Sequence, residues 1–408
     1  MGRHPDAERR AQEPAADDAR AGGRRRGELG RPRRARHGGH REGRADRGHP
    51  RRRPLGRRTG ARGDAGRTDR VPRAVPRRGG VVTLTATAAP TASTTSSSWA
   101  LPISLFSIPL GLAGLGGAWT AAAQLLGATA APAGLAYAAA TVVWAAFTVA
   151  YVVGTIRHKT GSFHLDLRHP LLGPLTAYIP VIAILLVAYY APDLGGAARW
   201  LVYAAVAALV INAAALVAHW LKAPLEQNAM HPGYFLPVTA GPFIAAIGVM
   251  SVGDTQVAIA FFGIGIFFWL LLGAVITSRL FFGSPLPLPF RPVLSILLSP
   301  PGTAGLAWFA IQHGQIDQLQ VAVGGITLFM LLIQLFFVPD YLRLSFSAQH
   351  WVFTFPLAVV GNLGVRWSAA LRFDGWQVVA WTVLGITTAA ILAILAGTLR
   401  DLARRITR

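Results

Sequence analysis

Ten apolar segments follow one another from Trp99 almost to the end of the chain, separated by short loops. A helix of about 20 residues crosses the hydrocarbon layer of a bilayer. A helix also satisfies its backbone hydrogen bonds internally, as lipid requires. We therefore predict an all-α polytopic membrane protein with ten transmembrane helices. The expected spans are 101–122, 133–156, 175–191, 199–221, 234–252, 256–280, 292–311, 319–338, 350–367 and 376–398.

Prolines distinguish alternate segments. Every odd-numbered segment contains prolines, whereas the even-numbered segments have none in their interiors. A proline removes a backbone hydrogen bond and bends a helix, which a bilayer tolerates only beside protein or a water-filled cavity. We therefore expect five helical hairpins, each a kinked helix followed by a straight one, with the kinked helices around a central pore. The recurring prolines are Pro109, Pro180, Pro242, Pro300 and Pro356.

The ninth segment, 349–367, places an aromatic ring beside its proline. Phe355 directly precedes Pro356, and no charge occurs before Arg366. A phenyl ring in a narrow apolar neck excludes water and offers a passing ion nothing in return for its hydration. Phe353 faces a direction about 200° away on a helix, so both rings cannot occupy one path. The spacing alone leaves open whether Phe355 closes a pore or packs against a neighbouring helix.

The first 80 residues differ sharply from the rest. They hold 25 of the 39 Lys and Arg residues and 10 of the 18 acids, a net charge of +15, whereas the rest carries +6. Such a composition cannot bury a core, so we predict disorder. The favoured interpretation is that residues 1–80 lie upstream of a natural start near Val81 or Val82. An Arg-rich arm for nucleic acid or anionic lipid and a targeting peptide are the alternatives.

The remaining chain then divides into three parts. Residues 81–98 form a polar leader, residues 99–400 form the ten-helix anion channel or transporter domain, and residues 401–408 form a basic tail. Because the high basicity belongs mostly to residues 1–80, we expect no nucleic acid as a partner of the membrane domain.

Basic residues in the loops predict the orientation. Eleven Lys and Arg residues lie on the side of the two termini, against three on the other side, Arg199, Arg366 and Arg372. Basic loops stay in the cytoplasm. We therefore expect a multi-pass protein of the cell inner (plasma) membrane with both termini cytoplasmic. We interpret the three remaining residues as single charges near helix ends that reach the interface.

The membrane part offers little catalytic chemistry. Its eight acids lie in loops or at segment ends, and cysteine is absent. Proton-driven transporters need a buried ionisable group, and membrane hydrolases need paired acids or metal ligands. We expect no enzyme, no cofactor and no bound metal. His169, His231 and His350 precede odd segments, where they are either interfacial caps or cytoplasmic anion contacts.

Hydroxyl and small residues remain inside the odd segments. Hydroxyls replace part of an anion's water shell without trapping it, unless each bonds back to its own helix. The glycines of 111–117 are better explained by close helix packing. The pore-lining candidates are Ser107, Pro109, Pro180, Thr239, Pro242, Ser299, Pro300, Thr354 and Pro356.

Four stretches carry a family resemblance: FSIPLGLAGLGGAW (106–119), HPGYFLPVTAGPFIAAIG (231–248), SPPGTAGLAW (299–308) and HWVFTFPLAVV (350–360). They resemble the bacterial tellurite-resistance membrane proteins, whose family includes dicarboxylate and sulfite transporters and the slow anion channels of plant guard cells. The resemblance covers about residues 99–398. It implies five hairpins, a pore lined by odd helices, a homotrimer with one pore per subunit, and a pore-plugging phenylalanine that matches Phe355.

We therefore expect an anion channel or passive anion transporter with a pore lined by the odd helices and gated by Phe355. Its partners would be the lipid bilayer, further copies in a homotrimer, and small inorganic or organic anions such as chloride, nitrate, sulfite or a dicarboxylate. The alternative is a coupled secondary transporter that exports a C4-dicarboxylate or sulfite. A channel follows the anion gradient alone, whereas a coupled carrier also responds to a proton gradient.

Overall fold

The computed structural model describes residues 101–157, 162–223 and 225–407, and these residues form helices and loops without a strand. The predictions for residues 1–80 and for the leader 81–98 lie outside this part of the chain. The longer helices are α1 (Ser107–Leu125), α2 (Ala131–Arg157), α3 (Ser162–Arg168), α4 (Tyr178–Leu194), α5 (Gly196–Lys222), α6 (Gly241–Met250), α7 (Thr255–Phe282), α8 (Ser299–Ile311), α9 (Gln318–Leu342), α10 (Thr354–Leu371) and α11 (Trp376–Ile406).

Short 3₁₀ or π segments precede the α-helices of the odd segments. They are η1 (Ile103–Phe106), η2 (Gly173–Ala177), η4 (Pro232–Tyr234), η5 (Leu236–Ala240), η6 (Leu288–Leu298) and η7 (Ala348–Phe353), with η3 (Gln227–Ala229) in a loop. All of these are 3₁₀ turns except η5, which is a π-helix. Among the described residues, nine helical segments are long and apolar enough to cross a membrane. The remaining predicted span, η7 with α10, is less apolar because it contains Asn362, Arg366 and Ser368.

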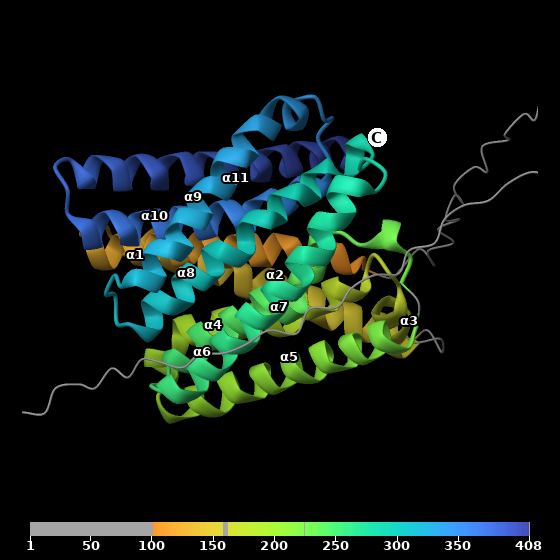
Figure 1. Cartoon of the computed structure of the whole chain (residues 1–408), viewed down its shortest axis with the longest axis horizontal. Helices are drawn as coiled ribbons and strands as arrows, with labels where there is room; N and C mark the ends of the chain where they lie inside the picture. The colour runs from red at the N-terminus through yellow and green to blue at the C-terminus, as the bar shows by residue number, and fades with distance from the viewer. Residues whose placement is uncertain (1–100, 158–161, 224, 408) are drawn as a thin grey trace, which may run out of the picture. The chain divides into compact units, whose positions relative to one another are not determined.

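The five helices of the odd segments form a closed inner ring. In ring order, α1 contacts α4, α4 contacts α6, α6 contacts α8, α8 contacts α10, and α10 returns to α1. Figure 1 shows α10 beside α1 within the bundle, with α11 at one edge and α5 at the other. In four of the inner segments, 56–89% of the most apolar window is buried, against 17–28% in the five outer helices. The predicted separation into inner and outer helices is confirmed.

The prolines lie where the backbone changes its hydrogen-bonding pattern, and not at kinks within regular helices. Pro109, Pro180 and Pro356 are the third residues of α1, α4 and α10. Pro242 and Pro300 are the second residues of α6 and α8. The N–H groups of a first helical turn have no acceptor within the α-helix, so proline loses nothing there. Each inner segment is therefore a short 3₁₀ or π segment joined to an α-helix at its proline.

Helices α9 and α11 extend beyond their predicted spans, and one short helix was not predicted. Helix α11 continues to Ile406, beyond the apolar run, with an Arg405–Asp401 ion pair on its polar end. Helix α9 ends at Leu342 and so includes Pro339, one residue past the predicted end. The short helix α3 follows α2 in a loop and was not predicted. Hydropathy detects only the part of a helix that is apolar, which explains all three differences.

Glycines bring the inner helices close together. A Cβ at Gly111 of α1 would lie 1.9 Å from Oγ1 of Thr354 on α10. A Cβ at Gly302 of α8 would lie 2.5 Å from Cγ1 of Val359 on α10, also too close for any substituent. Small residues let helix backbones approach in this way where lipid supplies no hydrophobic driving force. The glycines of α1 therefore serve packing, as predicted.

Candidate functional site

A cavity of about 460 Å³ lies between the C-terminal halves of the inner helices. At one end it reaches the loops that follow α6 and α8, and at the other it stops at Phe355. All five inner helices contribute to its wall, together with Tyr137 of α2 and Thr255 of α7. The inner-helix and loop residues are Ala113, Gly114, Gly117, Thr120, Leu185, Ala188, Tyr189, Ile244, Ile247, Met250, Ser251, Gly253, Thr303, Leu306, Ala310, His313, Phe355, Val359, Asn362 and Arg366.

Each inner helix turns a single face toward the cavity. Helix α10 supplies Phe355, Val359, Asn362 and Arg366, which are spaced by four, three and four residues. Residues three and four apart lie above one another on a helix. The same spacing occurs on α1 and α8. The cavity therefore follows the axis of the ring and is not a gap between two helices.

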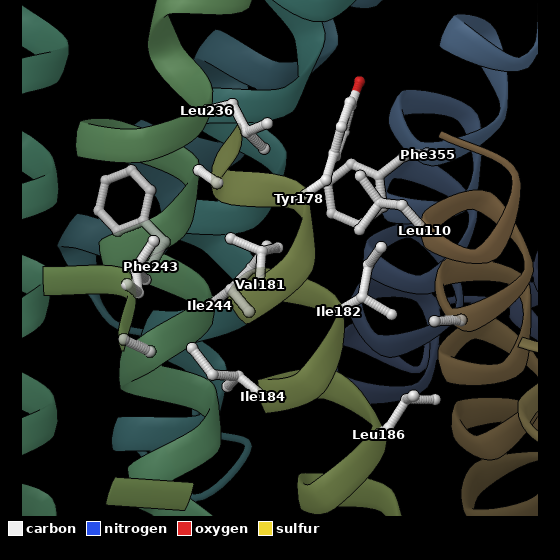
Figure 2. Close-up of a cluster of buried hydrophobic side chains, with 14 of the residues drawn as sticks. Leu110, Tyr178, Val181, Ile182, Ile184, Leu186, Leu236, Phe243, Ile244 and Phe355 are labelled. Carbon is white, nitrogen blue, oxygen red and sulfur yellow. The ribbon is translucent and has the colours of Figure 1, made fainter. Parts of the chain in front are cut away.

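Phe355 forms the inner end of the cavity. Its ring packs against α1, where Cδ2 lies 3.2 Å from the position that a Cβ of Gly114 would occupy. Only 7% of the residue is exposed. Figure 2 shows Phe355 close to Leu110 and Tyr178 in the view, and all three belong to one buried cluster of side chains. Beyond Phe355 the ring is filled by such side chains.

The end of the cavity away from Phe355 contains polar groups and a positive charge. Nε of Arg366 donates a hydrogen bond to Oδ1 of Asn362 at 2.9 Å. Near Asn362, the Tyr137 ring of α2 stacks on the Tyr189 ring of α4, with centroids 3.8 Å apart. The described lining residues include no Asp or Glu. The wall therefore presents donors and one cation to whatever occupies the space.

Arg366 corrects one expectation from the sequence. The sequence predicts a charge near a helix end that reaches the membrane surface, as for Arg199 and Arg372. Arg199 does pair at the surface, with Oδ2 of Asp254 at 3.4 Å. Arg366 instead lines the cavity, because α10 belongs to the inner ring and turns this face toward the axis. Arg366 follows Phe355 by eleven residues on α10, which is about three helical turns. This spacing in the sequence indicates that the two residues share one face of the helix.

The other predicted pore-lining residues are buried on the far side of Phe355. None of them lies among the described lining residues of the cavity, so their role in a path stays a prediction. These residues are Ser107, Pro109, Pro180, Thr239, Pro242, Ser299, Pro300, Thr354 and Pro356.

Most hydroxyls of the odd segments bond back to their own helix. Ser107 Oγ donates to the Ser104 carbonyl at 2.8 Å, and Thr354 Oγ1 donates to the Trp351 carbonyl at 2.7 Å. These bonds satisfy the hydroxyls locally. Thr239 differs from these residues, since its Oγ1 is buried without a hydrogen-bond partner. The hydroxyls are thus mainly part of the helix geometry.

Of the three histidines before odd segments, His231 and His350 cap helical turns, and His169 stabilises the turn before η2. Nδ1 of His231 accepts a hydrogen bond from the Gly233 N–H, and Nδ1 of His169 accepts one from the Leu171 N–H. His350 accepts from the Ser347 N–H. Burial lowers the pKa of His231 to about 4, so its ring is neutral at physiological pH. Of the two alternatives left open by the sequence, the structure supports the cap.

Acids near the cavity mouth already have partners. Asp254 caps α7 and accepts a hydrogen bond from Tyr203, which lowers the pKa of the carboxyl. Asp317 caps α9 through the Gln320 N–H at 2.8 Å, and this bond lowers its pKa. Among the residues that the structure describes, no group of His, Cys, Asp or Glu is arranged to hold a metal ion.

Comparison with known proteins matches residues 100–399 to the family described as voltage-dependent anion channel. The chain is 26% identical to the tellurite resistance protein TehA homolog of Haemophilus influenzae over 269 residues, 64% of this chain and 80% of that protein. It is also 26% identical to the guard cell S-type anion channel SLAC1 of Arabidopsis thaliana over 182 residues, 44% of this chain and 32% of that protein. A third relative, S-type anion channel SLAH2 of Arabidopsis thaliana, is 23% identical over 234 residues, 56% of this chain and 44% of that protein. The family resemblance drawn from the four stretches is confirmed.

Proposed function

We propose, on the premise that this chain belongs to the voltage-dependent anion channel family, that it conducts small anions passively through a membrane. The path would follow the axis of the inner ring. The family's named relatives include anion channels and a tellurite resistance protein. The matched segment covers less than half of each plant channel, so substrate and mechanism are argued from the residues of this chain.

The observation that carries the proposal is the cavity that ends at Phe355. All five inner helices line it, which is the arrangement that a path along the ring axis requires. An aromatic ring in an apolar neck excludes water, and dry constrictions of this kind gate pores. We therefore assign Phe355 as the gate.

The closed part of the path continues past Phe355. Each inner helix can be followed along its cavity-lining face for one or two turns toward its N-terminus. This face then reaches Leu110 on α1, Tyr178 on α4 and Ser299 on α8. All three residues are buried. Leu110 and Tyr178 are large and fill this part of the helix ring, whereas Ser299 supplies a hydroxyl on the path. Ser299 is thus the predicted pore-lining residue that the lining faces support best.

A passive mechanism fits the chemistry of the wall better than a coupled one. Proton-coupled transporters use a carboxylate or another ionisable group within the membrane. The described lining residues of the cavity include no carboxylate. Hydroxyls, an amide and one cation favour small anions such as chloride, nitrate or sulfite. An exporter of dicarboxylates driven by protons would need a carboxylate or a histidine within the membrane, whereas the one histidine among the described lining residues, His313, lies in the loop after α8.

The proposed setting is the cell inner membrane, with both termini in the cytoplasm. The basic residues on the side of the termini support this orientation. The cavity then opens to the outside of the cell, since inner helices run outward from the cytoplasm. The outer helices expose many large apolar side chains, which suits contact with lipid and with two further copies in a homotrimer, one path per subunit.

The gate is tested by Phe355→Ala. Removal of the ring opens the neck, so anion flux through the protein in liposomes should rise severalfold or more. The measurement is chloride or nitrate efflux from proteoliposomes at equal amounts of folded protein. The matched control is Phe353→Ala, because Phe353 packs against Tyr341 of α9, with ring centroids 4.7 Å apart, and does not line the cavity. Removal of this half-buried ring should lower the stability by about 1–3 kcal/mol and leave the flux unchanged.

Two results would contradict the proposal. Flux of folded Phe355→Ala equal to that of the wild type would remove Phe355 from the gate. Flux that follows an imposed proton gradient in the absence of an anion gradient would replace the passive channel by a coupled carrier.

A further inference from the structure

The cavity contains a cationic cluster that a gate of apolar side chains does not require. Asn362 and Arg366 lie on α10, one and two turns further along the lining face than Val359, and Tyr137 reaches the same region from α2. We propose that Arg366, Asn362 and Tyr137 form a binding site for one small monovalent anion, such as chloride or nitrate, in the cavity outside Phe355. This inference rests on the proposed function, because it names the site where the conducted anion would bind beside the gate.

The hydrogen bond within the cluster fixes which groups face the anion. Nε–H of Arg366 can only donate, so the atom of Asn362 that accepts it at 2.9 Å is Oδ1. The amide nitrogen of Asn362 is then a donor directed elsewhere. The terminal N–H groups of the guanidinium also remain as donors. The pair is thus oriented by one internal bond and keeps its positive charge and its other donors available.

Tyr137 adds a hydroxyl at the same place. Nδ2 of Asn362 lies 3.2 Å, and the hydroxyl oxygen of Tyr137 3.4 Å, from the position that a Cβ of Gly117 would occupy. The two polar atoms are therefore within about 7 Å of each other, by the sum of these two distances. Stacking on Tyr189 holds the Tyr137 ring in place. Gly117 leaves the space between the two groups free of a side chain.

The charge in the cluster lacks a counterion from the protein. None of the ion pairs among the described residues includes Arg366, and the cavity wall that the structure describes contains no carboxylate. The nearby acids Asp254 and Asp317 are engaged by other donors. A charge removed from bulk water is unfavourable unless it is paired. An anion from solution supplies that pair.

The chemistry also predicts the kind of anion and the strength of binding. One guanidinium with an amide and a hydroxyl balances a single negative charge, so a divalent carboxylate would keep an uncompensated charge. Binding through one charge and a few neutral donors holds an anion weakly enough to release it, which conduction requires. The site would raise the local concentration of anions beside Phe355 without trapping them.

Chloride binding to the detergent-solubilised wild-type protein tests the site directly. The measurement is line broadening of the ³⁵Cl NMR signal during titration with potassium chloride, with nitrate as competitor. We expect saturable broadening that nitrate reverses. Arg366→Gln should weaken chloride binding at least tenfold. Arg372→Gln is the matched control, because Arg372 is an exposed arginine that follows the same helix and does not line the cavity, and it should bind chloride as the wild type does.

A second variant separates binding from structural support. Asn362→Asp keeps an acceptor for Nε of Arg366 and so preserves the local bond, but it places a carboxylate beside the guanidinium. It should lose saturable chloride binding while its melting temperature stays near that of the wild type. Saturable chloride binding that persists in both folded variants would overturn the site.

The same experiments distinguish failure of the site from failure of the proposed function. Arg366-dependent chloride binding in a protein without anion flux, even as Phe355→Ala, would support the site and refute the channel. Anion flux in a wild-type protein whose chloride binding ignores Arg366→Gln would support the channel and refute the site.

Discussion

The two halves of the inner helices are built differently. The half toward the loops after α6 and α8 is regular α-helix, surrounds a cavity and carries Arg366 and Asn362. The other half begins with 3₁₀ or π segments, contains the recurring prolines and is filled by buried side chains such as Leu110 and Tyr178. The boundary between the two halves is Phe355. Irregular backbone thus coincides with the closed half, which buried side chains fill, and regular helix coincides with the cavity half.

This difference changes how prolines in a membrane segment are interpreted. None of the five recurring prolines is among the described lining residues of the cavity. They mark the place where each chain changes from 3₁₀ or π geometry to α geometry within a tightly packed ring. If that is correct, the closed half should respond to mutation as a protein core does, and only the cavity half should respond as a ligand site. Three variants of the closed half test this, in addition to the changes at Phe355 and Arg366.

The largest effect is expected from Gly111→Ala. The added Cβ would lie 1.9 Å from Oγ1 of Thr354, which is fully buried and already donates to the Trp351 carbonyl. Neither backbone can move without separating α1 from α10, so stability should fall by about 3 kcal/mol or more. Thermal unfolding in detergent measures the loss.

The control for this variant is Gly263→Ala on the outer helix α7. Nothing lies within 4 Å of a Cβ there, and alanine favours a helix by up to about 1 kcal/mol over glycine. Its melting temperature should stay level or rise. A Gly111→Ala protein that melts like the wild type would show that the closed half is loosely packed.

A smaller loss of stability is expected on acidification, because His231 at the start of the closed half becomes protonated. Burial lowers its pKa from an ordinary value of 6.5 to about 4, and the Arg279 charge acts in the same direction. Between these values the unfolded chain binds more protons than the folded one, so stability falls as the pH falls from 6.5 toward 4. The loss at pH 5 is about 2 kcal/mol for this group.

His231→Asn isolates that contribution. Asparagine retains an acceptor for the Gly233 N–H but does not titrate. The difference between melting temperatures at pH 7.5 and pH 5 should therefore be smaller in the variant than in the wild type. An equal difference in both proteins would assign the acid sensitivity to other groups.

The smallest effect is expected from Thr239→Val. The Thr239 hydroxyl is fully buried without a partner, and such a group costs free energy that an apolar group of the same shape does not. The variant should be more stable by about 1 kcal/mol, with unchanged anion flux. Chemical or thermal unfolding and liposome efflux measure the two quantities. A change in flux would instead place Thr239 on the path and weaken the division into two halves.

Much of the fold could be predicted from the sequence because lipid imposes simple rules. The predicted span 256–280 corresponds to Thr255–Phe282, and the alternation of prolines separated inner from outer helices. The polar end of α11 was missed because Arg404 and Arg405 lie beyond the apolar run, where hydropathy gives no signal.

The site was harder to predict. Phe355 was singled out because it precedes a proline, and the structure places it at the end of the cavity. Arg366 was assigned to the surface, since a lone charge near a helix end usually reaches the interface. Which face of α10 points to the ring axis depends on contacts with α1 and α8, and these contacts are tertiary. Once Phe355 fixes that face, steps of three and four residues identify Asn362 and Arg366.

If Phe355 closes the path as proposed, it also decides where an electrical potential across the membrane would act. A water-filled cavity is nearly at the potential of the solution that fills it, so the drop concentrates over the filled, low-dielectric half of the ring. A charge that crosses the whole drop changes its energy by about 2.3 kcal/mol per 100 mV. An anion beside Arg366 would feel little of that field, whereas one that passes Phe355, Leu110 and Tyr178 would feel almost all of it.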